Sequence, residues 1–330
     1  MKNRNRILYF DTLKLLAVVW IFFCHFAHKF NDDFLQSLYQ GASGVFFYGF
    51  TGTWATTLLA VISGFFSYQS GKKSNLVYFI IKRYVMFFLI FLITQIVVSV
   101  FMLFPDGSTH GLLEILKSSL LLDSSIYPNF WWIRSFLIGD IVSFTNSNFK
   151  PKKYVFAYIL TEIIVFYFVD VWVSICVLGN IIYLVNNQKN CILTNIRKNV
   201  FLKVTILILF VFLIKHDGEH RIIHFVWGLS SFVLIILIEC SYRIKKILSN
   251  EFISKFGKYT ISIFSLHRTI YLLFGFVLFR LTFIPYKILF FLVFVILLMI
   301  TVAFAIPLES FIRKTTILIS NYLYRIFKTE

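Results

Sequence analysis

Long apolar runs follow one another along almost the whole chain, with only short polar stretches between them. A helix of about 20 residues crosses the hydrocarbon core of a bilayer, so runs of this length predict membrane-spanning helices. Backbone N–H and C=O groups in lipid need partners within the segment itself, and an α-helix supplies them. We therefore predict an all-α, polytopic transmembrane bundle of about ten spans. The predicted spans are 8–28, 44–68, 80–104, 128–146, 153–170, 171–187, 200–215, 222–241, 258–281 and 286–306.

Composition excludes an ordinary soluble domain. Only 14% of the residues are charged and 59% are hydrophobic, whereas a soluble domain has about 25% charged residues. The segment from Arg6 to His28 begins like a signal peptide, but Asp11 and Lys14 interrupt its apolar part, so we interpret it as an uncleaved first span. The four cysteines form no CxxC pair, and neither a disulfide framework nor a zinc site is predicted.

Basic residues are distributed unevenly between alternate loops. Of the 32 lysines and arginines, 22 fall on one side of the predicted bundle and 6 on the other, and the rest lie inside spans. Since cytoplasmic loops carry the excess of basic residues, both termini are predicted to be cytoplasmic, with 29–43, 105–127 and 216–221 outside. The net charge of +17 is therefore explained by membrane orientation, and nucleic acid is not predicted as a partner. We predict a membrane domain at 1–306 and a cytoplasmic amphipathic tail at 307–330, lying on the inner leaflet.

Three ionisable residues of the first span are candidate site residues, because each costs about 2.5–3.5 kcal/mol at the centre of a membrane helix. Asp11 lies three residues before Lys14, close enough to form an ion pair. Lys14 and His25 share one stripe of the helix and lie about 16 Å apart along its axis. A histidine near the outer surface can act as a general base on a hydroxyl. The alternative interpretation is an interfacial histidine that merely meets water.

Three motifs of the chain resemble those of one family. The opening YFDTLKLLAVVWIFFCHF resembles the first helix of the acyltransferase-3 family of membrane acyltransferases, in which Asp, then Arg or Lys, and after ten residues His follow one another. The segment AVISGFFSYQSGKK is similar to the family's Ser-Gly-Phe motif, and GKYTISIFSLHRTIYLL to its late Gly-Lys-x-Ser…Leu-His segment. The chain departs from the family in two places. Lys14 stands where arginine is common, and Met86 follows Arg83 where the family often has a second arginine.

The resemblance implies transfer of an acyl group, acetyl above all, from cytoplasmic acetyl-CoA or another acyl-CoA to a hydroxyl of a cell-envelope glycan or its lipid-linked precursor. His25 is then the base, while Lys14 and Asp11 keep the stripe polar and orient the donor. The donor-binding residues are Ser63, Gly64, Lys72, Lys73, Lys82 and Arg83, and the acceptor-binding residues are Trp131, Trp132, Arg134, His267 and Arg268. No permanently bound cofactor and no metal are predicted. The predicted setting is the plasma membrane, with membrane lipids and glycan-synthesis proteins as further partners.

Several of these residues have a second interpretation. The basic loops can serve membrane orientation alone, Ser63 and Gly64 can allow close helix packing, and the tryptophan pair can belong to an aromatic belt. Deep ionisable residues are expected to pair inside the bundle: Asp140, Glu162, Lys203 and Arg268. His216, His220 and His224 recur at four-residue intervals, which a metal site or a wet loop explains. The rival functions are a glycan or metabolite transporter or flippase, and a membrane scaffold or sensor.

Overall fold

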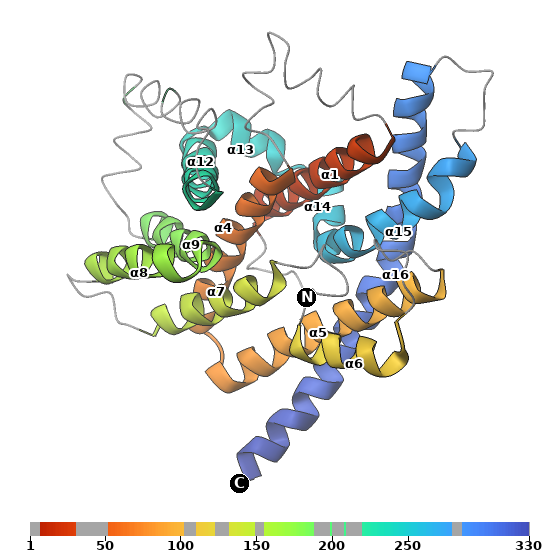
Figure 1. The fold of residues 1–330 in the computed structure, drawn as a ribbon. Helices are drawn as coiled ribbons and strands as arrows, with labels where there is room; N and C mark the ends of the chain where they lie inside the picture. Colours follow the sequence, from red (N-terminus) through yellow and green to blue (C-terminus); the bar gives the residue numbers. More distant parts are fainter. Residues whose placement is uncertain are drawn as a thin grey trace. The chain divides into compact units, whose positions relative to one another are not determined.

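The structure is a computed structural model of the chain. It describes residues 7–30, 52–101, 110–122, 132–148, 155–187, 220–278 and 286–329, together with positions 199 and 208. The regular structure of these residues consists of helices without strands (Figure 1), which confirms the all-α prediction for this part of the chain. The chain forms two compact units: the first is Met1–Leu76 with Ile138–Lys258, and the second is Val77–Leu137 with Tyr259–Glu330.

The first unit is built around α4. Its helices are α1 (Leu8–Phe30), α4 (Gly52–Gly71), most of α7 (Ile133–Asn146), α8 (Val155–Val169), α9 (Val171–Asn187), α12 (His220–Cys240), α13 (Tyr242–Leu248) and α14 (Glu251–Phe256). Helix α4 packs against α1, α9 and α12. A Cβ atom on Gly64 would lie 1.8 Å from the carbonyl oxygen of Cys176 in α9. One on Gly179 would lie 2.2 Å from the carbonyl oxygen of Val61 in α4. Glycine on both helices therefore allows their backbones to approach closely.

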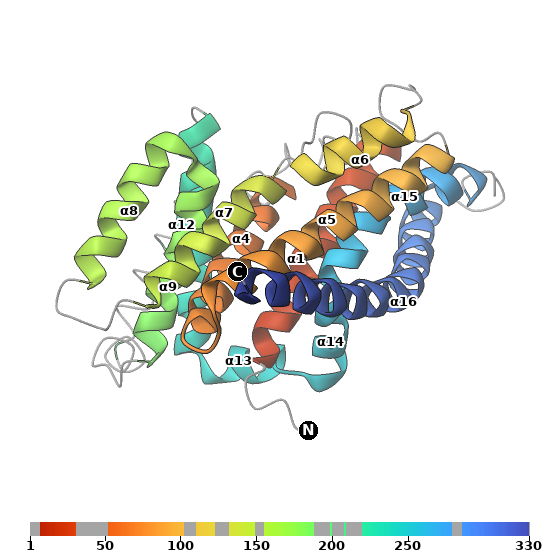
Figure 2. The ribbon, with the colours of Figure 1, turned by 90° about the horizontal axis from the view of Figure 1, so that it is seen from below.

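The second unit contains a helix that passes through a proline. Its helices are nearly all of α5 (Leu76–Val100), α6 (Leu112–Leu121), the start of α7, α15 (Thr260–Leu278) and α16 (Tyr286–Thr329). Helix α16 packs against α15 and bends along its length (Figure 2), which Pro307 inside the helix explains. Since α16 continues to Thr329, the boundary predicted between residues 306 and 307 is not a helix end. A proline is tolerated in an apolar helix where neighbouring groups satisfy the freed carbonyl.

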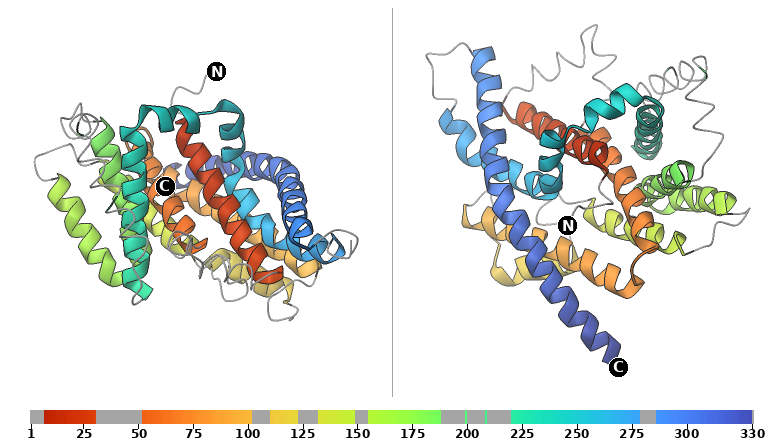
Figure 3. Two further views of the ribbon diagram at one scale, coloured as in Figure 1. Left: turned by 90° about the horizontal axis from the view of Figure 1, so that it is seen from above. Right: turned by 180° about the vertical axis from the view of Figure 1, so that it is seen from behind.

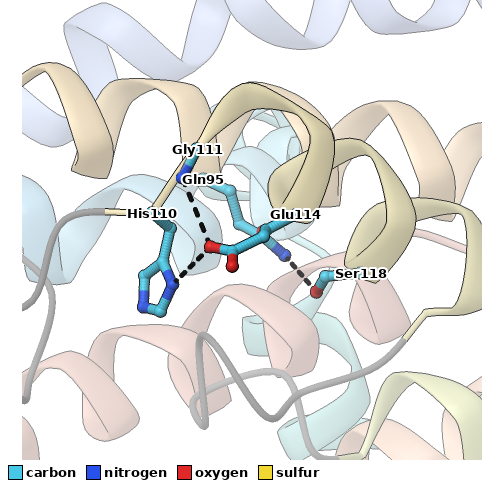
Figure 4. Close-up of polar contacts among 5 residues, drawn as sticks. All are labelled: Gln95, His110, Gly111, Glu114 and Ser118. Carbon is cyan, nitrogen blue, oxygen red and sulfur yellow. Dashed lines mark hydrogen bonds and ion pairs between the residues drawn. The ribbon is translucent and has the colours of Figure 1, made fainter.

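Helix α6 lies in a segment for which the sequence analysis predicted no helix. Its first turn is capped, because the Glu114 carboxylate accepts a hydrogen bond from the backbone N–H of Gly111 at 3.3 Å and contacts Nδ1 of His110 at 3.2 Å (Figure 4). The buried amide of Gln95 in α5 donates to the hydroxyl of Ser118 in α6 at 3.1 Å. This helix is therefore stabilised by its cap and by a contact with a side chain distant in sequence. It does not form a long apolar run of the kind used to predict spans.

Four of the described helices are long and apolar enough to cross a membrane: Leu8–Phe30, Leu76–Val100, Arg221–Cys240 and Ile288–Lys328. Two apolar helices are shorter, Tyr158–Val169 and Val171–Val185. Each predicted span corresponds to a described helix except 200–215, which lies outside the described residues apart from position 208. The count of ten spans and the cytoplasmic placement of both termini stay predictions.

Candidate functional site

The first part of the site is an ion pair near the start of α1. The Lys14 ammonium lies 2.6 Å from Oδ1 of Asp11, which confirms the predicted pairing. The side chains are 26% and 8% exposed, respectively, so the carboxylate is the more deeply buried partner and depends on its counter-ion. The ammonium also lies 5.3 Å from the ring centre of Phe66 in α4, and this cation–π contact fixes the side chain on α4.

His25 lies near the other end of the same helix. Because α1 is unbroken from Leu8 to Phe30, the separation of about 16 Å between Lys14 and His25 along the helix axis holds. The His25 side chain is half-buried. Its neighbour Cys24 approaches the first residue of α4, where a Cβ on Gly52 would lie 3.6 Å from that of Cys24. The histidine is thus set apart from the ion pair, next to the residue of α1 that meets the start of α4.

A buried carboxylate that the sequence analysis did not assign to the site joins α7 to α4. The hydroxyls of Ser63 and Ser67 both donate to Oδ1 of Asp140, each at 2.7 Å. Asp140 is 0% exposed. The prediction that Asp140 is paired inside the bundle is confirmed, and its partners are hydroxyls. Two serines four residues apart face the same side of a helix, and this spacing was the signal available in the sequence.

These contacts gather on one face of α4, which we call the 63–67 face: Ser63, Phe66 and Ser67. Residues three and four apart are neighbours on a helix surface. Lys14 approaches this face from α1, and Asp140 approaches it from α7. A cation and a carboxylate from two other helices therefore meet α4 at the Ser-Gly-Phe motif and directly after it, within an apolar unit.

The other predicted donor residues of the first unit lie beside this face or at the end of α4. Gly64 is pressed against α9 at Cys176, which supports its interpretation as a packing residue. The ammonium of Lys72 lies 4.8 Å from the ring centre of Tyr183. Lys72 and Lys73 are both exposed in the turn that follows α4. Their charged groups are therefore accessible to an anion, while the Lys72 chain is fixed by an aromatic contact.

In the second unit, two predicted acceptor residues meet around Phe264 of α15. The ring centres of Trp132 and Phe264 are 5.2 Å apart, and those of Phe264 and His267 are 5.3 Å apart. His267 is 1% exposed, and its Nδ1 donates to the carbonyl of Phe264. Because a carbonyl can only accept, Nδ1 carries the proton in this contact, which leaves Nε2 as the other ring nitrogen of His267.

The remaining predicted site residues of the second unit are dispersed over its helices. Arg134 is exposed on α7, Arg268 is half-buried on α15, and Lys82 is exposed on α5. The Arg83 guanidinium lies 5.6 Å from the ring centre of Phe79. Trp131 lies outside the described residues.

The alternative involving metal gains no support from the described part of the chain, where no three His, Cys, Asp or Glu residues gather. His216 and the side chain of His220 lie outside that part. The ring centres of His224 and Trp172 are 5.1 Å apart. Of the other deep residues, Glu162 accepts a hydrogen bond from the amide of Asn146, and Lys203 lies outside the described residues.

The helices of this site are apolar, yet they hold an ion pair, a hydrogen-bonded carboxylate and a half-buried histidine. This combination indicates a membrane protein that has a polar site among its helices. The comparison with known proteins then gives the family. The family model described as an acyltransferase domain matches residues 7–309, a range that contains every residue of the candidate site. The chain belongs to the acyltransferase-3 family, as its three motifs indicated, and it is a membrane acyltransferase. No curated protein and no solved structure matches the chain.

Proposed function

We propose that this acyltransferase takes an acetyl group from cytoplasmic acetyl-CoA and transfers it to a hydroxyl of an extracytoplasmic or lipid-linked cell-envelope glycan. It acts as a multi-pass protein of the plasma membrane, with ten spans and both termini in the cytoplasm. The observation that carries the proposal is the organisation of α1, which holds the Asp11–Lys14 pair near its start and His25 near its end. A single helix thus links a charged group suited to the donor with a proton acceptor suited to the opposite surface.

The proposed reaction uses His25 as a general base. A ring nitrogen of His25 takes the proton of the acceptor hydroxyl while the hydroxyl oxygen attacks the thioester carbonyl carbon. A new C–O ester bond forms and the C–S bond breaks. The sulfur leaves as the thiolate of CoA and takes up the proton from the imidazolium, which restores neutral His25. The reaction needs no metal and no redox partner, and it is driven by the energy of the thioester.

In this proposal, the acyl-CoA donor is bound by charged residues. Lys14 lies on the 63–67 face of α4, where its ammonium orients the acyl-pantetheine arm. Asp140 fixes the hydroxyls of Ser63 and Ser67 from the neighbouring helix, so we assign it the role of a positioning residue. The nucleotide phosphates are bound by the basic residues of the cytoplasmic ends of α4 and α5: Lys72, Lys73, Lys82 and Arg83.

The acceptor end is proposed to involve the second unit. The rings of Trp132 and His267 both lie next to that of Phe264, and aromatic rings of this kind give a sugar a platform on which polar groups set its orientation. Arg134, Arg268 and Trp131 complete the proposed acceptor set. Membrane lipids surround the helices, and proteins of glycan synthesis supply the acceptor.

The test follows the acyl group itself. A strain that lacks the native gene is made to express either the wild-type protein or His25→Ala. Membranes from each are supplied with acetyl-CoA that carries ¹⁴C in its acetyl group, and the label that enters the envelope glycan is measured. We expect the transfer rate of the variant to be lower by a factor of about 100 to 10,000, which is the usual contribution of a positioned general base. His28→Ala is the matched control, because His28 lies three residues further along α1 and is exposed. Its transfer rate should stay near that of the wild type.

Three results would count against the proposal. Near-normal labelling in His25→Ala at equal protein level removes His25 from the mechanism. If equal amounts of label enter the glycan with and without the protein, the protein is not the enzyme that transfers the acetyl group. Unlabelled glycan that nevertheless crosses the membrane only when the protein is present favours a transporter.

A further inference from the structure

Two short helices follow α12 directly and lie at one end of the first unit. Helix α12 contains the candidate span Arg221–Cys240, and α13 begins at Tyr242. Figure 3 (left) and Figure 2 show α13 lying across the start of α1 and the end of α12, whereas α1 and α12 run lengthwise through the unit. We call residues 241–258 the crosswise segment. Because α12 is long and apolar enough to cross a membrane, a segment joined directly to its end is expected at a membrane surface.

The crosswise segment exposes large apolar side chains. Tyr242 is 77%, Ile247 73% and Phe252 71% exposed, and none of the α13 residues is buried. Exposed apolar groups of this size are unfavourable in water, at about 25 cal/mol for each Å². Next to a membrane surface they are the groups that insert into the boundary between headgroups and acyl chains.

The same segment carries a strong excess of positive charge. Its basic residues are Arg243, Lys245, Lys246, Lys255 and Lys258, and its one acidic residue is Glu251. Exposed basic residues beside exposed aromatic and aliphatic ones are typical of helices that lie on anionic lipid. This excess of positive charge repels a partner with a basic surface and attracts the phosphate groups of lipid headgroups.

Contacts with α1 hold the segment in place. The Lys245 ammonium lies 2.6 Å from Oε2 of the buried Glu239, whose other carboxylate oxygen accepts from the hydroxyl of Tyr9 in α1. A Cβ on Gly257 would lie 2.1 Å from the carbonyl oxygen of Asp11. The segment is thus joined to α1 at both of its ends, close to the ion pair of the candidate site.

We propose that the crosswise segment is a lipid-binding surface that lies on the inner leaflet, binds anionic phosphate headgroups through Arg243, Lys246, Lys255 and Lys258, and inserts Tyr242, Ile247 and Phe252. Lys245 is engaged with Glu239 and links the surface to α1. The proposal does not depend on the identity of the acyl donor or acceptor. It uses the orientation that the basic loops predict, with this end of the unit facing the cytoplasm.

The test measures which lipid surrounds the segment in the full-length protein. Phe252→Cys and Ile164→Cys are each prepared with Cys191→Ser, because Cys24, Cys176 and Cys240 are buried and protected from a bulky label. Ile164 is the matched reference, since it is 60% exposed on the apolar helix α8 and carries no basic neighbour within three residues. Each variant is labelled with a fluorophore and placed in vesicles that contain either spin-labelled phosphatidylglycerol or spin-labelled phosphatidylcholine at the same mole fraction.

At position 252 we expect the anionic spin-labelled lipid to be enriched about fivefold over the neutral one, the attraction that roughly one basic residue exerts near a membrane surface. At position 164 the two lipids should quench equally. The variant Arg243→Gln, Lys246→Gln, Lys255→Gln, Lys258→Gln should lose the preference at position 252 but keep quenching by the neutral lipid.

Two outcomes overturn the proposal. Equal quenching by the two lipids at position 252 shows that no anionic headgroup is bound. Quenching by iodide in water without quenching by either lipid shows that the segment faces the cytoplasm or a protein partner.

Discussion

Asp140 in the first unit and His267 in the second are both buried polar residues on apolar helices, but they are held in different ways. Asp140 accepts hydrogen bonds from two hydroxyls of another helix, at 2.7 Å each. His267 bonds to the carbonyl of Phe264 in its own helix and packs beside the rings of Phe264 and Tyr271. The contacts of Asp140 between helices are therefore polar, whereas the His267 ring packs beside two aromatic rings of its own helix.

The difference predicts how each region responds to substitution. A hydrogen bond between buried groups depends on atom type, because a partner that loses its acceptor is left unpaired in an apolar setting. A ring contact depends on shape and volume, so another ring of similar size replaces it at small cost. The surroundings of Asp140 in the first unit should thus be sensitive to changes of polarity, and those of His267 in the second unit to changes of size.

The largest effect is expected for Lys14→Ala in the first unit. The substitution leaves the buried Asp11 carboxylate without the ammonium that lies 2.6 Å from it, and breaking a buried pair costs about 3–5 kcal/mol. The double variant Asp11→Asn, Lys14→Met removes both charges and should recover most of the lost stability, although transfer stays low. Thermal unfolding of the purified protein and the amount of membrane-inserted protein are the measurements. Equal stability of the single and double variants would contradict the coupling of the two charges.

A smaller effect is expected for Asp140→Ala. The hydroxyls of Ser63 and Ser67 lose this acceptor, and removing the acceptor of a hydrogen bond in an apolar setting costs about 1–3 kcal/mol. Asp140→Asn is the matched control, since its amide oxygen accepts the same two hydrogen bonds, and it should cost less than about 1 kcal/mol. Both are measured by thermal unfolding. If Asn and Ala destabilise the protein equally, the negative charge of Asp140, rather than its hydrogen bonds, is what the first unit requires.

Helix positions could be predicted from the sequence because apolar length is a local property. The predicted span 8–28 corresponds to α1 at Leu8–Phe30, and 171–187 to α9 at Val171–Asn187. Helices α6, α13 and α14 were not predicted, since they are short, and α13 and α14 mix basic with apolar residues. The boundary between residues 306 and 307 was predicted because the following segment mixes apolar with basic residues, and the sequence does not show that α16 continues through Pro307 to Thr329.

The site was predictable only where its contacts lie within one helix. Asp11 and Lys14 are three residues apart, so their pairing follows from helix geometry. The bonds from Ser63 and Ser67 to Asp140 join segments that are 77 and 73 residues apart. Which helices pack together decides such contacts, and periodicity alone does not contain that information.

Tight packing in the first unit gives the next effect in size. Gly64→Ala places a Cβ at 1.8 Å from the carbonyl oxygen of Cys176, so α4 and α9 must move apart, at a cost of about 1–3 kcal/mol for an overpacked core. Gly111→Ala is the matched control, because no atom lies within 4 Å of its Cβ position. Gly111 is the N-cap of α6, where alanine is less favourable than glycine, so a small decrease in melting temperature is expected, well below that of Gly64→Ala. A stable Gly64→Ala variant would show that the interface yields more readily than the backbone contact indicates.

The smallest effect on stability is expected for His267→Phe in the second unit. The new ring keeps the contacts with Phe264 and Tyr271 but loses the bond from Nδ1 to the Phe264 carbonyl. Because that carbonyl belongs to the same helix and a ring replaces a ring, the cost should stay below about 1 kcal/mol. His267→Ala also removes the two ring contacts, worth about 0.5–1.5 kcal/mol each, and should be clearly less stable.

The same pair of variants tests the role of His267 in transfer, because His267→Phe separates ring shape from the ring nitrogen Nε2. If His267 orients the glycan, His267→Phe should retain the fold and raise the KM for the acceptor without changing the KM for acetyl-CoA. Initial rates are measured with each substrate varied in turn. A His267→Phe protein that unfolds as readily as His267→Ala would break the contrast between the units, since the second unit would then depend on a hydrogen bond as the first does. Retained stability with an unchanged acceptor KM would leave His267 as a packing residue, in which case ring shape alone explains its burial between Phe264 and Tyr271.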